Sequence, residues 1–345
     1  MSDPVEKRAG VEVYFKESDP LKENVMDRAQ SRRSMLASVA TLSAAFAMRS
    51  PLAALFASRA RVSLPHSLIP SHSRPFDPDH ERLTSWADTL RAEGLTDSRI
   101  PLGRAAVRVG ELARGTPYEA STLEAYLRAG GDATNAEPLT LWLTRFDCVS
   151  LVESCLAVAR AARTSQSTPT WDAFAREIER MRYRGGKRGS YASRLHYFSE
   201  WISDGARRGL LRDIAPELGA EDDTRPLRFM TEHRKSYVAL ADDRVFAQIA
   251  TMERSLDGQA RHLIPTARIA EVSDRIQTGD VLGFATSIPG LDVTHSAFAY
   301  RDANGVLRVL HAPLSGGSVE VSHYELPDYV AAIKRSTGIL LARPL

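Results

Sequence analysis

The chain has 345 residues, a formal net charge of +2 and a hydrophobic content of 43%. This is the composition of a globular protein, with enough apolar residues for one large domain or two small ones. The near-neutral charge gives no reason to expect a nucleic-acid partner.

Residues 1–60 predict an export signal. Arg32-Arg33 precedes an apolar, alanine-rich run at 35–47, which has the length of a signal-peptide core and is too short to span a bilayer. Adjacent arginines in this position are typical of a twin-arginine signal, and residues 45–47 (Ala-Phe-Ala) fit a cleavage site. The alternative is a basic arm followed by a short amphipathic helix. We expect an exported, periplasmic protein without stable membrane insertion.

Residues 61–82 are rich in proline, serine and histidine, and predict a linker. The folded domain is then expected at 83–345. Its first part, to about residue 127, has a helical pattern that is broken at 115–118 (Gly-Thr-Pro-Tyr).

The stretch 141–160 predicts a helix that begins at a cysteine. Asp147 occupies the position of an N-cap, and Cys148 falls in the first turn of an apolar 3.6-residue pattern. Free backbone N–H groups and the helix dipole favour a thiolate there. Cys148 is therefore a candidate nucleophile, with a buried core residue as the alternative.

Cys155 lies seven residues after Cys148 on the same predicted helix. The two Cα atoms would be roughly 10 Å apart, too far for a disulfide, and the spacing does not match a CxxC pair. We expect Cys155 to be a small buried core residue.

Further amphipathic helices are predicted at 170–182 and 191–211, while the pattern at 212–270 gives no clear prediction. Short strands separated by turn residues follow, and a helix at 324–335 precedes a last strand. The predicted strands lie at 279–285, 293–300, 306–312, 318–322 and 338–342. Helices followed by an antiparallel sheet predict an α+β domain.

Two histidines of this sheet could serve a thiolate, which needs a base and a group that orients the base. His295 and His311 lie on strands joined by a turn at 302–305, and symmetric pairing about residue 303 would place them roughly opposite each other. The alternatives are structural histidines, or a zinc site with Cys148, although no close-spaced ligand pair is present. We expect neither a metal nor a cofactor.

These motifs together resemble the NlpC/P60 papain-like cysteine peptidase superfamily. Within it, the chain is most similar to the N-acetylmuramoyl-L-alanine amidase-like family also called DUF1460. The resemblance covers roughly residues 100–345. It rests on the segments at 115–118, 146–148, 182–204, 279–300 and 310–313.

The resemblance implies a papain-like fold in which N-terminal helices carrying the cysteine pack on a C-terminal antiparallel sheet. It further implies that Cys148 is the nucleophile, His295 the general base and His311 the orienting residue. Tyr118 would line the pocket and help hold the oxyanion. Asp147 corresponds to an acid that binds a substrate amine in some relatives, with a helix cap as the alternative.

The chain departs from the superfamily pattern beside two of these residues. Val149-Ser150 follows the cysteine in place of Ser-Gly, and Ser296-Ala297 follows His295 in place of Val-Gly. We expect both changes to narrow or reshape the pocket.

A basic and aromatic block at 182–204 suits carboxylates and sugars of a muropeptide, because arginine binds carboxylates in a bidentate manner. The alternative is a solvated helix face with buried tyrosines. The candidate substrate-binding residues are Arg182, Tyr183, Arg184, Arg194, His196 and Tyr197.

The sequence thus predicts a monomeric cysteine amidase that cleaves the N-acetylmuramoyl-L-alanine bond of peptidoglycan or muropeptides through a thioester acyl-enzyme. One alternative is a γ-D-glutamyl-diamino-acid endopeptidase of the same superfamily. The others are an inactive muropeptide-binding protein and a zinc hydrolase.

Overall fold

The computed structural model describes residues 77–313 and 317–345. The predicted export signal at 1–60 and the predicted linker up to residue 76 lie outside the described residues. The first described helix, α3 (Pro78–Ala92), begins inside the predicted linker. Asp79 accepts a hydrogen bond from the backbone N–H of Leu143 at 2.6 Å, and His80 stacks on Trp171. These contacts tie α3 to the rest of the described residues, so part of the range predicted as a linker is helical, and the domain division at 83 stays a prediction.

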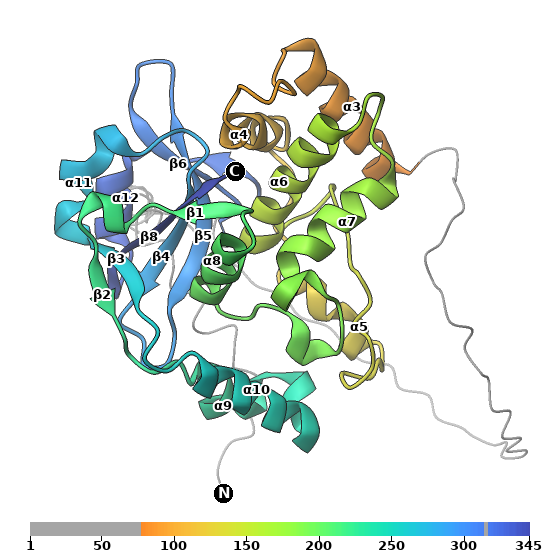
Figure 1. The fold of residues 1–345 in the computed structure, drawn as a ribbon, viewed down its shortest axis with the longest axis vertical. Coiled ribbons are helices and arrows are strands. Elements are labelled where there is room, and N and C mark those ends of the chain that lie inside the picture. The colour runs from red at the N-terminus through yellow and green to blue at the C-terminus, as the bar shows by residue number, and fades with distance from the viewer. Residues whose placement is uncertain (1–76, 314–316) are drawn as a thin grey trace, which may run out of the picture. The chain divides into compact units, whose positions relative to one another are not determined.

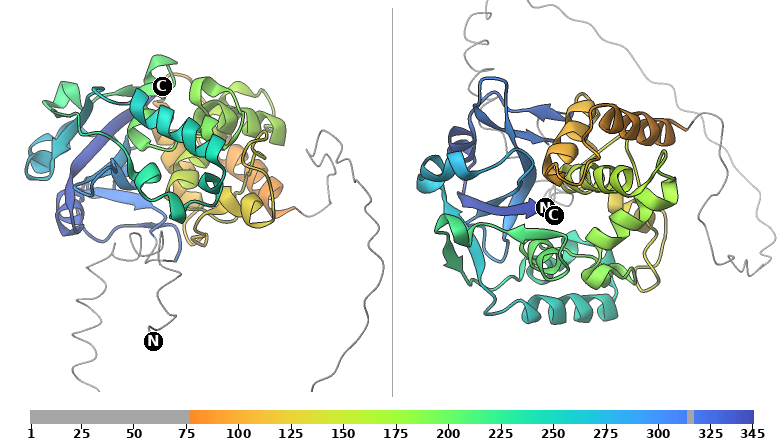
Figure 2. Two further views of the ribbon diagram at one scale, coloured as in Figure 1. Left: turned by 90° about the horizontal axis from the view of Figure 1, so that it is seen from below. Right: turned by 45° about the horizontal axis from the view of Figure 1, so that its top comes forward.

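Five helices form a layer on one side of a sheet (Figures 1 and 2). The central one, α6, begins at Cys148 as predicted, and it contacts α3, α4, α7 and β5. Because it is enclosed on these sides, most of α6 is buried. The layer consists of α3, α4 (Leu102–Leu112), α6 (Cys148–Thr164), α7 (Trp171–Arg182) and α8 (Phe198–Arg207).

The sheet is antiparallel throughout the described pairs, with strand order β2-β3-β8-β4-β5-β6-β7 and β1 paired to β8. The predicted α+β class, with helices before an antiparallel sheet, is confirmed. The strands are β1 (Leu211–Asp213), β2 (Glu221–Asp223), β3 (Arg261–Pro265), β4 (Val281–Thr286), β5 (Val293–Arg301), β6 (Leu307–His311), β7 (Glu320–Val321) and β8 (Ser336–Pro344).

The two faces of the sheet pack against different elements. On β5, Phe298 and Tyr300 face the helical layer, while Ala297 and Ala299 face a second core. That second core is closed by α11 (Ile269–Val272) and α12 (Leu326–Ala332). Successive side chains of a strand alternate between the faces, so two neighbouring residues of β5 meet different surroundings.

The predicted helix at 191–211 is interrupted. A 3₁₀ turn at Tyr191–Ser193 leads into extended backbone, where the N–H of Leu195 donates to the carbonyl of Arg182 at 2.9 Å. The helix α8 starts only at Phe198, and the chain is already in β1 at Leu211.

The region without a clear prediction, 212–270, contains α9 (Phe229–Glu232) and α10 (Asp243–Ser255). They form a third core with Tyr191 and Tyr197. None of the helices in the described part of the chain is long and apolar enough to cross a membrane.

Candidate active site

Cys148 is the first residue of α6, and its position depends on a capping box. The carboxylate of Asp147 accepts the backbone N–H of Ser150 at 2.7 Å, and the Ser150 hydroxyl accepts the backbone N–H of Asp147 at 2.9 Å. This reciprocal pair satisfies two backbone donors at the helix start. The carboxylate of Asp147 thus caps the helix, which was the structural alternative for this residue.

The thiol of Cys148 is subject to opposing effects. Its burial, together with the negative charge of Asp147, raises the pKa of Cys148 to about 11. The backbone N–H and hydroxyl of Ser296, and the backbone N–H of Val149, oppose this rise by hydrogen bonding. Burial dominates, so the resting group at neutral pH is a thiol, contrary to what the helix position alone indicates.

His295 and His311 are in direct contact. Nε2 of His295 lies 2.8 Å from Nδ1 of His311, and the two rings meet edge to face with centroids 5.0 Å apart. The pairing of Phe298 with Leu310 places His311 across from Ala297, not across from His295. The predicted register was therefore wrong by two residues. Because side chains alternate with a period of two, this shift leaves both histidines on the same face.

The surroundings of the histidine pair keep His295 neutral. The ring of Phe284 stacks on His295 with centroids 5.7 Å apart, and the Tyr329 hydroxyl lies 3.4 Å from Nδ1 of His311. Burial lowers the pKa of His295 to about 4. Neither Phe284 nor Tyr329 was predicted as a site residue. Phe284 pairs directly with His295 across β4 and β5, which only the strand order reveals.

The thiol lies beside the residue that follows His295 on β5. This residue is Ser296, and His295 itself lies on the same face as its partner Phe284. Within the described part of the chain, no hydrogen bond joins the thiol to His295. The structure therefore brings together the neighbouring segments of the two residues, with the thiol beside Ser296 and the imidazole in contact with His311.

Tyr118 also belongs to this neighbourhood. Its backbone forms a single β-bridge with Phe146, two residues before the cysteine. Burial raises the pKa of Tyr118 above its ordinary value, and the charges of Cys148 and Asp147 add to the effect. The phenol is therefore a hydrogen-bond donor throughout the neutral range.

Arg182 and Tyr183 are occupied inside the fold. The guanidinium of Arg182 donates to Glu153 at 2.7 Å and to the carbonyl of Thr140 at 2.7 Å, and the residue is 3% exposed. The Tyr183 hydroxyl donates to buried Glu137 at 3.3 Å. We do not include these two residues among the proposed substrate contacts.

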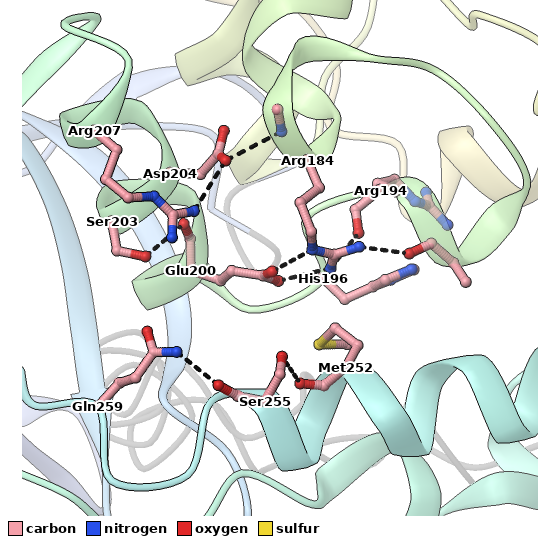
Figure 3. A network of polar contacts seen from close by, with 12 residues as sticks. Arg184, Arg194, His196, Glu200, Ser203, Asp204, Arg207, Met252, Ser255 and Gln259 are labelled. Carbon is pink, nitrogen blue, oxygen red and sulfur yellow. Dashed lines mark hydrogen bonds and ion pairs between the residues drawn. The ribbon is translucent and has the colours of Figure 1, made fainter.

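Arg184 and Arg194 also pair with carboxylates of the chain. Arg184 donates to both oxygens of Glu200, at 2.5 and 3.0 Å (Figure 3). Arg194 is 6% exposed, and its guanidinium lies 3.4 Å from Glu124 and 3.7 Å from Glu137. Arg184, with 33% of its side chain exposed, is the more accessible of the two.

His196 and Tyr197 continue the same polar interior. Nε2 of His196 lies 2.9 Å from the carbonyl of Tyr191, and burial lowers the pKa of His196 well below its usual value, with the charge of Arg194 adding to the effect. The Tyr197 hydroxyl donates to fully buried Glu253 at 2.7 Å. The block has the carboxylate-binding chemistry predicted for it, but here its carboxylate partners come from the protein itself.

The described residues contain no group of three or more histidine, cysteine, aspartate or glutamate side chains arranged to hold a metal ion.

A family model described as N-acetylmuramoyl-L-alanine amidase-like matches residues 108–339. A crystal structure of an N-acetylmuramoyl-L-alanine amidase from Bacteroides uniformis is 31% identical, with a TM-score of 0.63, and the match covers 71% of this chain and 99% of that one. A Bacteroides fragilis protein provisionally named a xylanase is 32% identical, with a TM-score of 0.59, covering 68% and 98%.

A Legionella pneumophila protein assigned to DUF1460 is 20% identical over 77% of this chain and 94% of that one, with a TM-score of 0.55, and this likeness concerns the fold alone. No curated protein matches the chain.

Proposed function

This chain belongs to the N-acetylmuramoyl-L-alanine amidase-like family, and we propose that it hydrolyses the bond between the N-acetylmuramoyl group and L-alanine in peptidoglycan or muropeptides, with Cys148 as nucleophile. One observation carries the proposal. The thiol at the start of α6 contacts β5 at Ser296, directly beside a histidine that is held by a second histidine.

In the proposed reaction, Nδ1 of His295 takes the proton of the Cys148 thiol. For Nδ1 to be the acceptor, Nε2 of His295 must carry the ring hydrogen, and it then donates to Nδ1 of His311 across the 2.8 Å contact. His311 is thereby the residue that orients the base, as the aspartate does in a serine triad.

The sulfur attacks the amide carbonyl carbon and the C–N bond breaks as His295 returns its proton to the leaving amine of L-alanine. The lactyl carbonyl remains on Cys148 as a thioester. A water molecule then gives one proton to His295 as its oxygen attacks the thioester carbon. The C–S bond breaks, and His295 returns that proton to the sulfur. The products are the thiol and the lactyl carboxylic acid, which ionises to the carboxylate.

The resting structure lacks one contact of this reaction. The thiol lies beside Ser296, and among the described residues no hydrogen bond joins Cys148 to His295. Catalytic hydrogen bonds often tighten only when substrate is bound. We propose that bound substrate brings Nδ1 of His295 within reach of the sulfur.

Two donors would stabilise the oxyanion of the tetrahedral intermediate. The backbone N–H of Cys148 stands in the first turn of α6, where it has no partner within the helix. The hydroxyl of Tyr118 keeps its proton because its pKa is raised. Donors of this kind, fixed in place before the reaction, stabilise developing negative charge at little reorganisation cost.

We also propose that the fold is of the NlpC/P60 papain-like type and that the protein acts in the periplasm after twin-arginine export. The support for the first is the order of cysteine helix and histidine strands. The support for the second is the Arg32-Arg33 pair before the apolar run at 35–47.

The test is mass spectrometry of the products from a defined disaccharide tripeptide of the cell wall. Wild-type protein is expected to release the intact peptide with a free L-alanine amine, and Cys148→Ala is expected to lower the rate by at least about a thousandfold, because the nucleophile is lost. Cys155→Ala, which changes the other cysteine of α6, should retain activity.

Other products would overturn the proposal in distinguishable ways. Cleavage after the D-glutamyl residue would identify the endopeptidase. Binding without cleavage by folded wild-type protein would identify a muropeptide-binding protein. Activity removed by a chelator and insensitive to iodoacetamide would identify a metal hydrolase.

A further inference from the structure

We propose that Ser296 is a positioning residue for the nucleophile: its buried hydroxyl donates a hydrogen bond to the sulfur of Cys148 and stabilises the thiolate. This inference rests on the proposed role of Cys148 and adds a residue to which the resemblance assigns no function.

The place of Ser296 in the sheet directs it at the cysteine helix. Phe298 and Tyr300 on β5 pack in the same core as α6. Ser296 lies two residues before Phe298, so its side chain is on the same face of the strand. His295, one residue earlier, lies on the face of Phe284. The alternation thus places Ser296 on the face of β5 that packs against α6, and Ser296 is the β5 residue that lies beside Cys148.

The hydroxyl of Ser296 is confined to this position. The residue is 1% exposed, and its Oγ makes no hydrogen bond to a nitrogen, oxygen or sulfur of the described residues. The sulfur of Cys148 lies beside it, and both the hydroxyl and the backbone N–H of Ser296 favour the charged form of that sulfur. A buried hydroxyl without a good acceptor is unfavourable, and a thiolate supplies the acceptor.

The other groups near the sulfur do not perform this task. The negative carboxylate of Asp147 disfavours the thiolate. Tyr118 is uncharged, and its backbone pairs with Phe146, two residues before the cysteine. His295 is neutral and bonded to His311. Burial by itself makes this thiol difficult to ionise, and the two donors of Ser296, together with the backbone N–H of Val149, offset part of that cost.

Valine, expected here from the sequence resemblance, would have the backbone N–H but no hydroxyl. The serine of this chain therefore adds one donor to the nucleophile. The effect is a property of the free enzyme and is measurable without substrate.

The experiment is alkylation of Cys148 by iodoacetamide as a function of pH, with the modified cysteine located by fragment-ion mass spectrometry. We expect Ser296→Ala to raise the apparent pKa of alkylation by about one unit and to slow the reaction at pH 7 about tenfold, because one pKa unit is a factor of ten in thiolate population. Ser296→Thr, which keeps the hydroxyl, should restore the wild-type profile.

Ser322→Ala is the matched control. Ser322 is also a buried serine of the sheet region, but its hydroxyl bonds to the backbone of Val309 and Tyr324. This variant should lower stability without moving the alkylation pKa. If Ser296→Thr does not fold, the thiolate absorbance near 240 nm in wild type and Ser296→Ala gives the same comparison.

An unchanged alkylation pKa in folded Ser296→Ala overturns the inference, and so does an equal shift in Ser322→Ala. Neither result depends on turnover. Failure of the amidase proposal would instead appear as wild-type protein whose Cys148 titrates as described but which cleaves no muropeptide.

Discussion

Desolvation of Cys148 and His295 disfavours the charged form of each side chain. The pKa of the thiol is raised to about 11 and that of the imidazole is lowered to about 4. A thiolate–imidazolium pair is therefore not the resting state. In the proposed mechanism the proton moves as the sulfur attacks, and the enzyme needs a neutral His295.

The first prediction concerns the protonation of His295. A group whose folded pKa lies below its unfolded value of about 6.5 stays neutral in the folded protein as the pH falls through 6.5, and it gains its proton only near pH 4. We expect kcat/KM to fall with decreasing pH only below about pH 5, where His295 gains its proton. The His295 Cε1–H resonance, assigned with His295→Gln, should stay constant from pH 8 to pH 5.5. Titration of that resonance near pH 6.5 would contradict the burial argument.

At the scale of single elements, α6 begins where its own sequence specifies. The Asp147 and Ser150 side chains close the capping box, and the cap holds Cys148 in the first turn. The extended segment at 194–197 is different, because its conformation follows from contacts with Arg182 and Tyr183. A local signal positions the nucleophile, whereas the polar block depends on distant partners.

The second prediction separates the two functions considered for Asp147. Asp147→Ala should lower the free energy of unfolding by about 1 kcal/mol through loss of the cap, while Asp147→Asn should retain most of the cap. Both variants remove the negative charge that raises the pKa of Cys148, so alkylation at pH 7 should become faster. Urea unfolding and the iodoacetamide rate are the measurements.

Thr170→Ala is the matched control, because Thr170 caps α7 by accepting the N–H of Ala173 at 3.2 Å, away from the thiol. It should cost a similar free energy without changing the alkylation rate. If Asp147→Asn keeps its stability but no longer cleaves a muropeptide, Asp147 contacts substrate in addition to capping the helix.

At the scale of the whole domain, the helical layer meets the sheet through a close backbone contact. Gly103 in α4 faces Gly279, which precedes β4, and a Cβ built on Gly279 would lie 2.1 Å from the carbonyl carbon of Gly103. Gly279 also has a positive φ of 93°. Two glycines are thus required at this contact, one from each layer.

The third prediction tests this contact. Gly279→Ala should destabilise the protein by about 2–4 kcal/mol for two reasons. An alanine at this positive φ is strained, and its Cβ would clash with Gly103 and displace α4. Gly305→Ala introduces alanine at a similar φ of 80° with nothing within 4 Å, and it should cost only about 1 kcal/mol. If urea unfolding shows that Gly279→Ala and Gly305→Ala lower the free energy of unfolding equally, the clash at Gly279 is relieved without cost.

The sequence by itself determined the elements whose signals are local. The cap at Asp147, the helix that starts at Cys148 and the strands at 293–300 and 306–312 are specified by neighbouring residues and by periodicity. Period-two alternation also placed His295 and His311 on one face, although their register was wrong by two residues.

Only the tertiary structure decided which groups surround those residues. The partners of Arg182 and Tyr197 are Glu153 and Glu253, and neither carboxylate can be chosen from many candidates without knowing the fold. The orientation of Ser296 toward the thiol likewise requires the packing of α6 on β5. The physical reason is range: hydrogen bonding within a turn or strand depends on adjacent residues, whereas burial, ion pairing and pKa depend on segments brought together by folding.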